Sequence, residues 1–255
     1  LKYVQFKKYQ EIKGTELKLD EKFVVDANEN SSLFLDGINS DSDLNFELKE
    51  NSTLLLSIIQ ETNLENTKIT ANLQQNSTII VYFADFSVKN CKPQILINLN
   101  GEGAKADFHL ASLAASNDNK NLDVSIMHNA KNTYGKVDNY GVCKDKAKLC
   151  FAGTSHIING ASKSSTYQNA KIMVFDPNSD AIAKPILKID ENDVVASHSA
   201  AVGKISDEHL FYLTSRGISL DEARNLITYG YLKPILKGFN DKEKTRLTNL
   251  IEGRL

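Results

Sequence analysis

A short sequence unit occurs three times in the first third of the chain, and it limits the folds that the chain can adopt. Residues 30–35 read Asn-Ser-Ser-Leu-Phe-Leu, residues 51–56 read Asn-Ser-Thr-Leu-Leu-Leu, and residues 76–81 read Asn-Ser-Thr-Ile-Ile-Val. The offsets of 21 and 25 residues are typical of solenoid repeats. Each copy joins a polar corner, apt for a turn, to a short apolar run, apt for a strand. The unit therefore predicts stacked strands separated by polar corners.

Further short runs of Ile, Val and Leu continue this pattern to about residue 189, and little helical periodicity interrupts them. A mainly β fold follows. A β-sandwich would need tight hairpins, and only Asp36-Gly37 and Asn159-Gly160 have a suitable turn sequence. A right-handed parallel β-helix needs corners instead of hairpins. We favour the β-helix and keep the sandwich as the alternative.

Residues 204–255 have a different character, because their sequence carries helix start and stop signals. Ser206 precedes two acidic residues and an apolar run, as an N-cap does, and Gly217 fits the end of that helix. Ser219 and Glu222 have the spacing of a capping box. These signals predict a small C-terminal helical region.

The chain is thus predicted to divide into a parallel β-helix core, residues 1–203, and a helical region, residues 204–255. Asn240 is the expected N-cap of the last helix. The last strand of a solenoid leaves an open edge that invites aggregation. We expect the helical region to cover that edge.

Composition excludes several classes of function. The 255 residues include 30 Lys and Arg and 32 Asp and Glu, a net charge of −2, so nothing favours binding to nucleic acid or to an anionic membrane. No apolar run is long enough to span a membrane, and residues 1–8 lack a signal-peptide core.

Cys91, Cys143 and Cys150 are read as reduced thiols. The expected location is cytoplasmic, or a plastid-type organelle if a transit peptide was removed.

Motifs for catalysis are missing from the sequence. It has no Gly-x-x-x-x-Gly-Lys-Ser/Thr phosphate loop, no Gly-x-Ser-x-Gly elbow and no His-Glu-x-x-His. We therefore expect no enzyme and no ATP hydrolysis by the chain alone. A β-helix protein acting on carbohydrate is the rival class, with Asp36, Asp41 and Asp43 as its carboxylates. The absence of tryptophan counts against this rival.

His198 is the histidine with the most unusual surroundings. It lies between the apolar pair Val194-Val195 and a run of small residues, 199–203. Imidazole is a ligand suited to iron. From the residues alone, a structural histidine is still the favoured interpretation.

Two further runs of residues stand out between residues 151 and 231. Residues 193–203 read Asp-Val-Val-Ala-Ser-His-Ser-Ala-Ala-Val-Gly, and residues 183–187 read Ala-Lys-Pro-Ile-Leu. The segment resembles the SufB/SufD family of iron–sulfur cluster assembly scaffolds, which has Asp-Val-Lys-(Cys/Ala)-Ser-His-Gly-Ala-Thr-Val-Gly and Thr-Lys-Pro-x-Leu at the corresponding places. Before residue 90 only the solenoid character is evident, and the helical N-terminal domain of longer members is expected to be absent or trimmed.

The resemblance implies a SufD-like, non-catalytic scaffold subunit of a SufBCD-type complex. SufB-like members carry a cysteine where this chain has Ala196, whereas SufD-like members carry a Ser-His pair. His198 is then the expected metal residue, at a cluster site shared with a partner subunit. No tightly bound cofactor is expected, only a transient iron–sulfur cluster at the complex interface.

The resemblance also implies two partners and the residues that meet them. A SufB-like subunit pairs with the last β-helix strands, at Val194 and Ala196. A SufC-like ATPase, which hydrolyses the ATP, docks on the C-terminal helices. The residues expected at that second contact are Leu210, Phe211, Tyr212, Arg216, Gly217 and Tyr231. The alternative within the family is a homodimeric structural subunit without metal chemistry.

Overall fold

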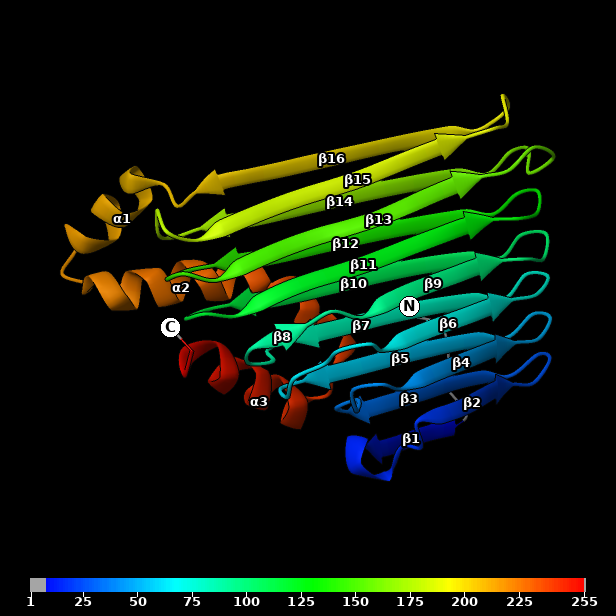
Figure 1. Ribbon diagram of the computed structural model, residues 1–255, viewed down its shortest axis with the longest axis horizontal. Helices are drawn as coiled ribbons and strands as arrows, with labels where there is room; N and C mark the ends of the chain where they lie inside the picture. Colours follow the sequence, from blue (N-terminus) through cyan, green and yellow to red (C-terminus); the bar gives the residue numbers. More distant parts are fainter. Residues whose placement is uncertain (1–7, 255) are drawn as a thin grey trace.

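Two parallel β-sheets face each other and form a β-solenoid in the computed structural model, which describes residues 8–254 (Figure 1). Residues 1–7, predicted to belong to the β-helix, and Leu255 lie outside the described residues. One sheet has the order β1-β3-β5-β7-β10-β12-β14-β16 and the other β15-β13-β11-β9-β6-β4-β2, with β8 beside β11. Every strand pair is parallel. The predicted β-helix is confirmed, and the sandwich alternative is wrong.

The chain alternates between the two sheets, so that each coil adds one strand to each sheet. The strands of the first sheet are β1 (Lys8–Lys13), β3 (Asn30–Asp36), β5 (Thr53–Gln60), β7 (Thr78–Asp85), β10 (Lys105–Ala114), β12 (Tyr134–Cys143), β14 (Ser165–Val174) and β16 (Val195–Lys204). Those of the second are β2 (Asp20–Val25), β4 (Asp43–Leu48), β6 (Lys68–Leu73), β8 (Asn90–Cys91), β9 (Gln94–Leu99), β11 (Asn119–His128), β13 (Lys148–Ile157) and β15 (Asp180–Ile189). A short 3-10 helix, η1 (Gly14–Glu16), follows β1.

Asparagines stack at the corners that lead into the first sheet. Asn28, Asn51 and Asn76 adopt left-handed backbone conformations, with φ of 62°, 57° and 54°, which asparagine tolerates better than most residues. Each donates its side-chain amide to the asparagine below, Asn51 to Asn28 at 3.3 Å and Asn76 to Asn51 at 3.2 Å. The first copy of the predicted repeat is wrong by two residues. Asn30 pairs in register with Thr53, so Asn28, and not Asn30, occupies the corner equivalent to Asn51.

Aspartate carboxylates link neighbouring coils at the corners on the other side of the solenoid. Asp118 accepts from the backbone N–H of Lys89, and Asp145 accepts from that of Ser116, both at 2.7 Å. Asp176 accepts in turn from the N–H of Asp145 at 2.7 Å. Each coil thereby satisfies donors of the coil below it, which fixes the order of stacking.

Large apolar side chains fill the interior of the lower coils. The interior positions of β4 to β9 carry Leu44, Phe46, Leu48, Leu54, Leu56, Ile58, Ile69, Leu73, Ile79, Val81, Phe83, Ile95, Ile97 and Leu99. An ion pair lies at one corner of this core, where Lys120 Nζ is 2.9 Å from Asp85 Oδ2 and both side chains are fully buried. Ser87 and Ser112 also donate to the Asp85 carboxylate. Together these bonds lower the pKa of Asp85 against the opposing effect of burial, the largest single influence.

Three helices and a 3-10 turn follow β16: α1 (Asp207–Thr214), α2 (Leu220–Leu232), η2 (Lys233–Gly238) and α3 (Asp241–Glu252). Their predicted caps are confirmed. Ser206 accepts from His209 N–H, and Ser219 and Glu222 form the capping box of α2. Asn240 caps α3, with Glu243 as the reciprocal partner. No helix of residues 8–254 combines the length and apolar character that crossing a membrane requires.

The helical region packs on the outer face of the first sheet, around a second hydrophobic core. From the helices it contains Leu232, Ile235, Leu236, Phe239, Leu247 and Ile251, and from the sheet Phe34, Ile59, Tyr82, Phe86, Leu113 and Val142. Figure 1 shows α2 and α3 alongside the stack and α1 beyond the strand ends, with β15 and β16 uncovered at the top. The expectation that the helices cover the open edge is therefore wrong. They cover a face, because β3 to β12 present an apolar outer surface there.

Candidate functional site

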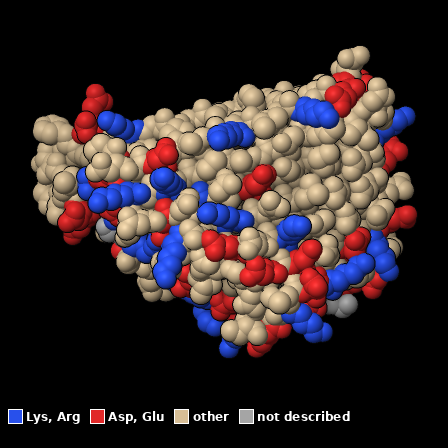
Figure 2. Space-filling model, viewed as in Figure 1, with Lys and Arg blue, Asp and Glu red and all other residues tan. Residues whose placement is uncertain are grey.

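The solenoid ends at β15 and β16, which we call the open end. Within residues 8–254, β16 is hydrogen-bonded only to β14, and β15 only to β13, so one edge of each strand is unpaired. β16 has ten residues and a single charged side chain, Lys204 at its end. Val195 is 56% exposed and Ile186 is 54% exposed. Figure 2 shows that charged side chains are sparse along this upper border and more frequent in the lower half of the same face.

The register assigns each residue of β16 to one of two faces. Ala196 pairs with Thr166 and His198 with Gln168, whose side chains are buried inside the solenoid. Residues paired in register share a face, so Ala196 and His198 are interior positions. His198 is exposed all the same, because no further coil within residues 8–254 lies above it. Val194 precedes the strand and is half-buried.

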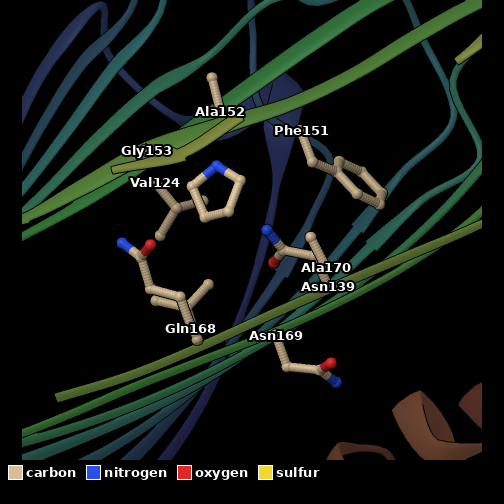
Figure 3. A pocket seen from close by; sticks show the side chains of 10 residues that line it. Val124, Asn139, Phe151, Ala152, Gly153, Gln168, Asn169 and Ala170 are labelled. Carbon is tan, nitrogen blue, oxygen red and sulfur yellow. The ribbon is translucent and has the colours of Figure 1, made fainter. Parts of the chain in front are cut away.

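A polar side chain, Gln168, lies directly beneath His198. Gln168 is 6% exposed, and its Nε2 donates to Ser155 Oγ of the opposite sheet at 2.8 Å. Asn139, one coil lower and in register with Ala170, is 5% exposed. Figure 3 shows the side chains of Asn139 and Gln168 rising toward Val124 and Gly153, with Asn169 pointing away. The space between them has a water-accessible volume of about 10 Å³, roughly one water molecule.

The described residues contain no group of three His, Cys, Asp or Glu side chains able to hold a metal ion. His198 thus belongs to no such group. The three cysteines are free thiols. Burial raises the pKa of each, that of Cys143 to about 11, so they stay protonated and are poor metal ligands.

A second exposed apolar area, which we call the helical surface, lies on α1 and α2. Phe211 is 73% exposed and Tyr212 54% exposed. The Arg216 guanidinium lies 4.4 Å from the centre of the Tyr212 ring, a cation–π contact. Leu220 and Leu226 are also exposed, although their helical spacing with Ala223 indicates a buried face. Only Ala223 of these three is buried, and the sequence offered no signal for the exposure of the two leucines.

Of the other residues predicted to contact an ATPase, Leu210 and Gly217 lie on or next to α1, and Tyr231 lies apart. Leu210 is half-buried, and Gly217 adopts a left-handed conformation, φ +89°, in the turn after α1. The Tyr231 ring lies edge-on to that of Tyr140 in β12, with the ring centres 5.7 Å apart. Burial there raises the pKa of Tyr231 to about 12. Tyr231 thus fastens α2 to the sheet, apart from the helical surface.

The three carboxylates considered for carbohydrate chemistry are engaged in contacts within the fold. Asp36 forms an ion pair with Arg246 at 2.8 Å. Asp41 accepts from Asn66 at 2.9 Å, and Asp43 accepts from Asn45 at 3.0 Å. These contacts are those of corner and strand residues and do not form a shared carboxylate site.

Residues 14–231 match the family model described as the SufBD core domain of the SUF system for iron–sulfur cluster assembly. The chain belongs to the SufBD family. SufD of Bacillus subtilis is 35% identical over 159 residues, which cover 62% of this chain and 36% of that protein. SufB of the same organism is 28% identical over 154 residues, 60% of this chain and 33% of the relative.

A SufBD family protein of Mycobacterium tuberculosis is 29% identical over 154 residues, 60% of this chain and 18% of the relative. The matched segments thus span about a third or less of the length of these relatives. The chain shares more identity with SufD than with SufB of Bacillus subtilis. It is a SufD-like member of an iron–sulfur assembly family, which confirms the resemblance found in the sequence.

Proposed function

We propose that this chain is a scaffold subunit that pairs with a SufB-like subunit through the open end and docks a SufC-like ATPase through the helical surface. In this proposal His198 contributes to the place where a transient iron–sulfur cluster is assembled between the subunits. The observation that carries the proposal is the open end itself. Two unpaired strand edges and an interior histidine lie together at this end of the solenoid, which the helices leave bare.

An edge strand of this kind is a template for pairing. Proteins ordinarily protect such an edge with charges, bulges or a covering element. The ten residues of β16 carry only Lys204, and Val195 and Val202 are exposed. A partner strand beside β16 would satisfy its free N–H and C=O groups and bury both valines. The chemistry of the edge thus favours a β-solenoid partner.

His198 fits a shared cluster site because of where pairing would place it. A single imidazole cannot hold a cluster, and the described residues contain no group of three His, Cys, Asp or Glu side chains that could. Pairing at the open end would surround His198 with the partner's residues and exclude water. Neutral imidazole binds iron well. The thiolate ligands of the cluster would come from the partner.

The helical surface is suited to receive a separate subunit. Aromatic residues and arginine are enriched at the centres of protein interfaces. Phe211 and Tyr212 lie exposed on α1, and Arg216, in the turn after it, packs on the Tyr212 ring. α1 begins three residues after β16 ends. α2 is fastened to the first sheet through Leu232 and Tyr231. Movement of a docked ATPase would therefore be passed to the open end.

Co-purification with SufB-like and SufC-like partners tests the proposal, with the mass and the ATPase rate of the product as readouts. We expect Val195→Lys to weaken pairing with the SufB-like subunit at least tenfold, because it places a charge at the edge. Val24→Lys, on the exposed side of β2 at the other end, is the matched control and should leave pairing unchanged. We expect Phe211→Ala to lose the ATPase and keep the SufB-like subunit.

Retention of the SufB-like subunit by Val195→Lys would contradict the assignment of the open end. A chain that binds neither partner but forms a dimer sensitive to Val195→Lys would favour the homodimeric alternative. For the cluster site, we expect a His198→Ala complex to assemble normally and to form cluster at least tenfold more slowly. Normal cluster formation by that complex would remove His198 from the proposal.

A further inference from the structure

Gln168 has a buried amide oxygen without a partner among the described residues. The side chain is 6% exposed, and Nε2 donates to Ser155 Oγ at 2.8 Å, so the orientation of the amide is set by a bond across the solenoid interior. Its Oε1 accepts no hydrogen bond. A buried acceptor left unpaired is costly, and native structures contain few. We therefore expect this oxygen to accept a hydrogen bond from a nearby donor.

His198 is the side chain placed to supply that donor. Gln168 and His198 are paired in register on β14 and β16, and paired residues in neighbouring strands lie about 4.8 Å apart on the same face. The neighbouring interior positions of β15 and β16 hold Ala183, Pro185, Leu187, Ala196, Ala200 and Val202. None of these six side chains can donate a hydrogen bond, so none of them competes for the amide oxygen. Asn139, which lines the cavity below Gln168, carries an amide donor as well.

We infer that Gln168 positions His198, with Gln168 Oε1 accepting a hydrogen bond from one ring nitrogen of the imidazole. That bond fixes which nitrogen carries the proton. The other nitrogen is then the unprotonated one and faces out of the open end. Ligand histidines are commonly oriented in this way by a carbonyl acceptor behind the ring. The link to cluster chemistry rests on the proposed function, whereas the hydrogen bond does not.

Nitrogen NMR of the chain labelled at histidine tests the hydrogen bond directly. The His198 signals are identified by their loss in His198→Ala. In the unaltered chain we expect one dominant tautomer of neutral His198. Gln168→Met removes the acceptor, and we expect a mixture of both tautomers, as for a solvated imidazole. Asn169→Met is the matched control, because Asn169 points away from the interior and should leave the His198 signals unchanged (Figure 3).

Gln168→Glu is the second variant, because Gln168→Met also loses the bond to Ser155 and some stability. A carboxylate is a stronger hydrogen-bond acceptor than an amide, so Gln168→Glu should keep one dominant tautomer and move the ring nitrogen signals of His198. The inference is overturned if Gln168→Met leaves the tautomer ratio unchanged and Gln168→Glu leaves the ring nitrogen signals unchanged. A crystal structure would then be expected to show a water bound to Gln168 Oε1 in the cavity beside Asn139.

The two proposals fail in different ways. If the NMR results hold and the His198→Ala complex still forms cluster at the normal rate, the role of His198 in assembly fails and its positioning by Gln168 stands. If cluster formation depends on His198 and neither Gln168 variant alters the His198 signals, the positioning fails and the proposed function stands.

Discussion

The interiors of the lower and upper coils differ in both size and polarity. Between β4 and β9 the interior positions are large and apolar, with Phe46, Leu56 and Phe83 among them. From β12 upward small and polar residues are mixed in among apolar ones such as Phe151, and Asn139 and Gln168 take central positions. Both regions belong to the same two parallel sheets, although the upper strands are longer. The regions therefore differ mainly in what fills the coil.

The contrast indicates that the lower coils serve mainly stability and that the upper coils serve the open end. Dense apolar packing provides most of the free energy of unfolding, and the lower coils have it. Polar groups inside a protein add little net stability and cost much when unpaired. Their presence under the open end fits our inference that Gln168 positions His198 there. Three experiments test this contrast.

Phe83→Ala should have the largest effect, because Phe83 is fully buried in the lower core. The lost apolar contacts and the cavity should reduce the free energy of unfolding by about 3–5 kcal/mol. Urea denaturation measures the change. Phe211→Ala removes the same ring from a site that is 73% exposed and should change stability by less than about 0.5 kcal/mol. Similar losses for both variants would mean that the lower core is not the main source of stability.

Acid should destabilise the upper coils through His128, which lies in the interior beside Gly135 of β12. Burial lowers the pKa of this histidine from 6.5 to about 4, and Nδ1 bonds to Thr133 Oγ1 at 2.8 Å. The folded state thus holds His128 neutral, while the unfolded chain takes up a proton below pH 6.5. Stability is complete above that pH and is lost as the pH falls toward 4. Between pH 7.5 and 5 the loss should be about 2 kcal/mol.

Urea denaturation across this pH range gives the slope, and His128→Gln should flatten it. His156→Gln is the control, because His156 is paired with Asp190 on the outside of β13. A slope that survives in His128→Gln would assign the acid sensitivity to other groups.

Asn139→Leu should have the smallest effect of the three. The Oδ1 atom of Asn139 is buried without a partner, so a leucine of similar shape removes an unpaired acceptor and adds apolar contact. We expect the free energy of unfolding to change by less than about 1 kcal/mol, in the stabilising direction. Thermal unfolding measures it. A loss above about 2 kcal/mol would show that a bound water satisfies Asn139, and that the upper interior is as well satisfied as the lower one.

Local structure followed from short stretches of the amino-acid sequence. Asn51 and Asn76 mark corners because asparagine tolerates a left-handed backbone. Ser219 and Glu222 mark the start of α2 because they bond to backbone groups within three residues. Signals of this kind act between close neighbours, so they can be read without the fold. The family signature around His198 likewise named the family before any coordinates.

Only the tertiary structure decided what each element covers and which side chains are left exposed. Whether Leu226 is buried, or whether the helices cover an edge or a face, depends on residues far along the chain. Ser57, for example, donates to the carbonyl of Gly238 at 2.6 Å, a contact across 181 positions. The pairing of Gln168 with His198 is of the same kind, since it follows from the length of a coil. Burial is a property of all the coils together, and no local pattern contains it.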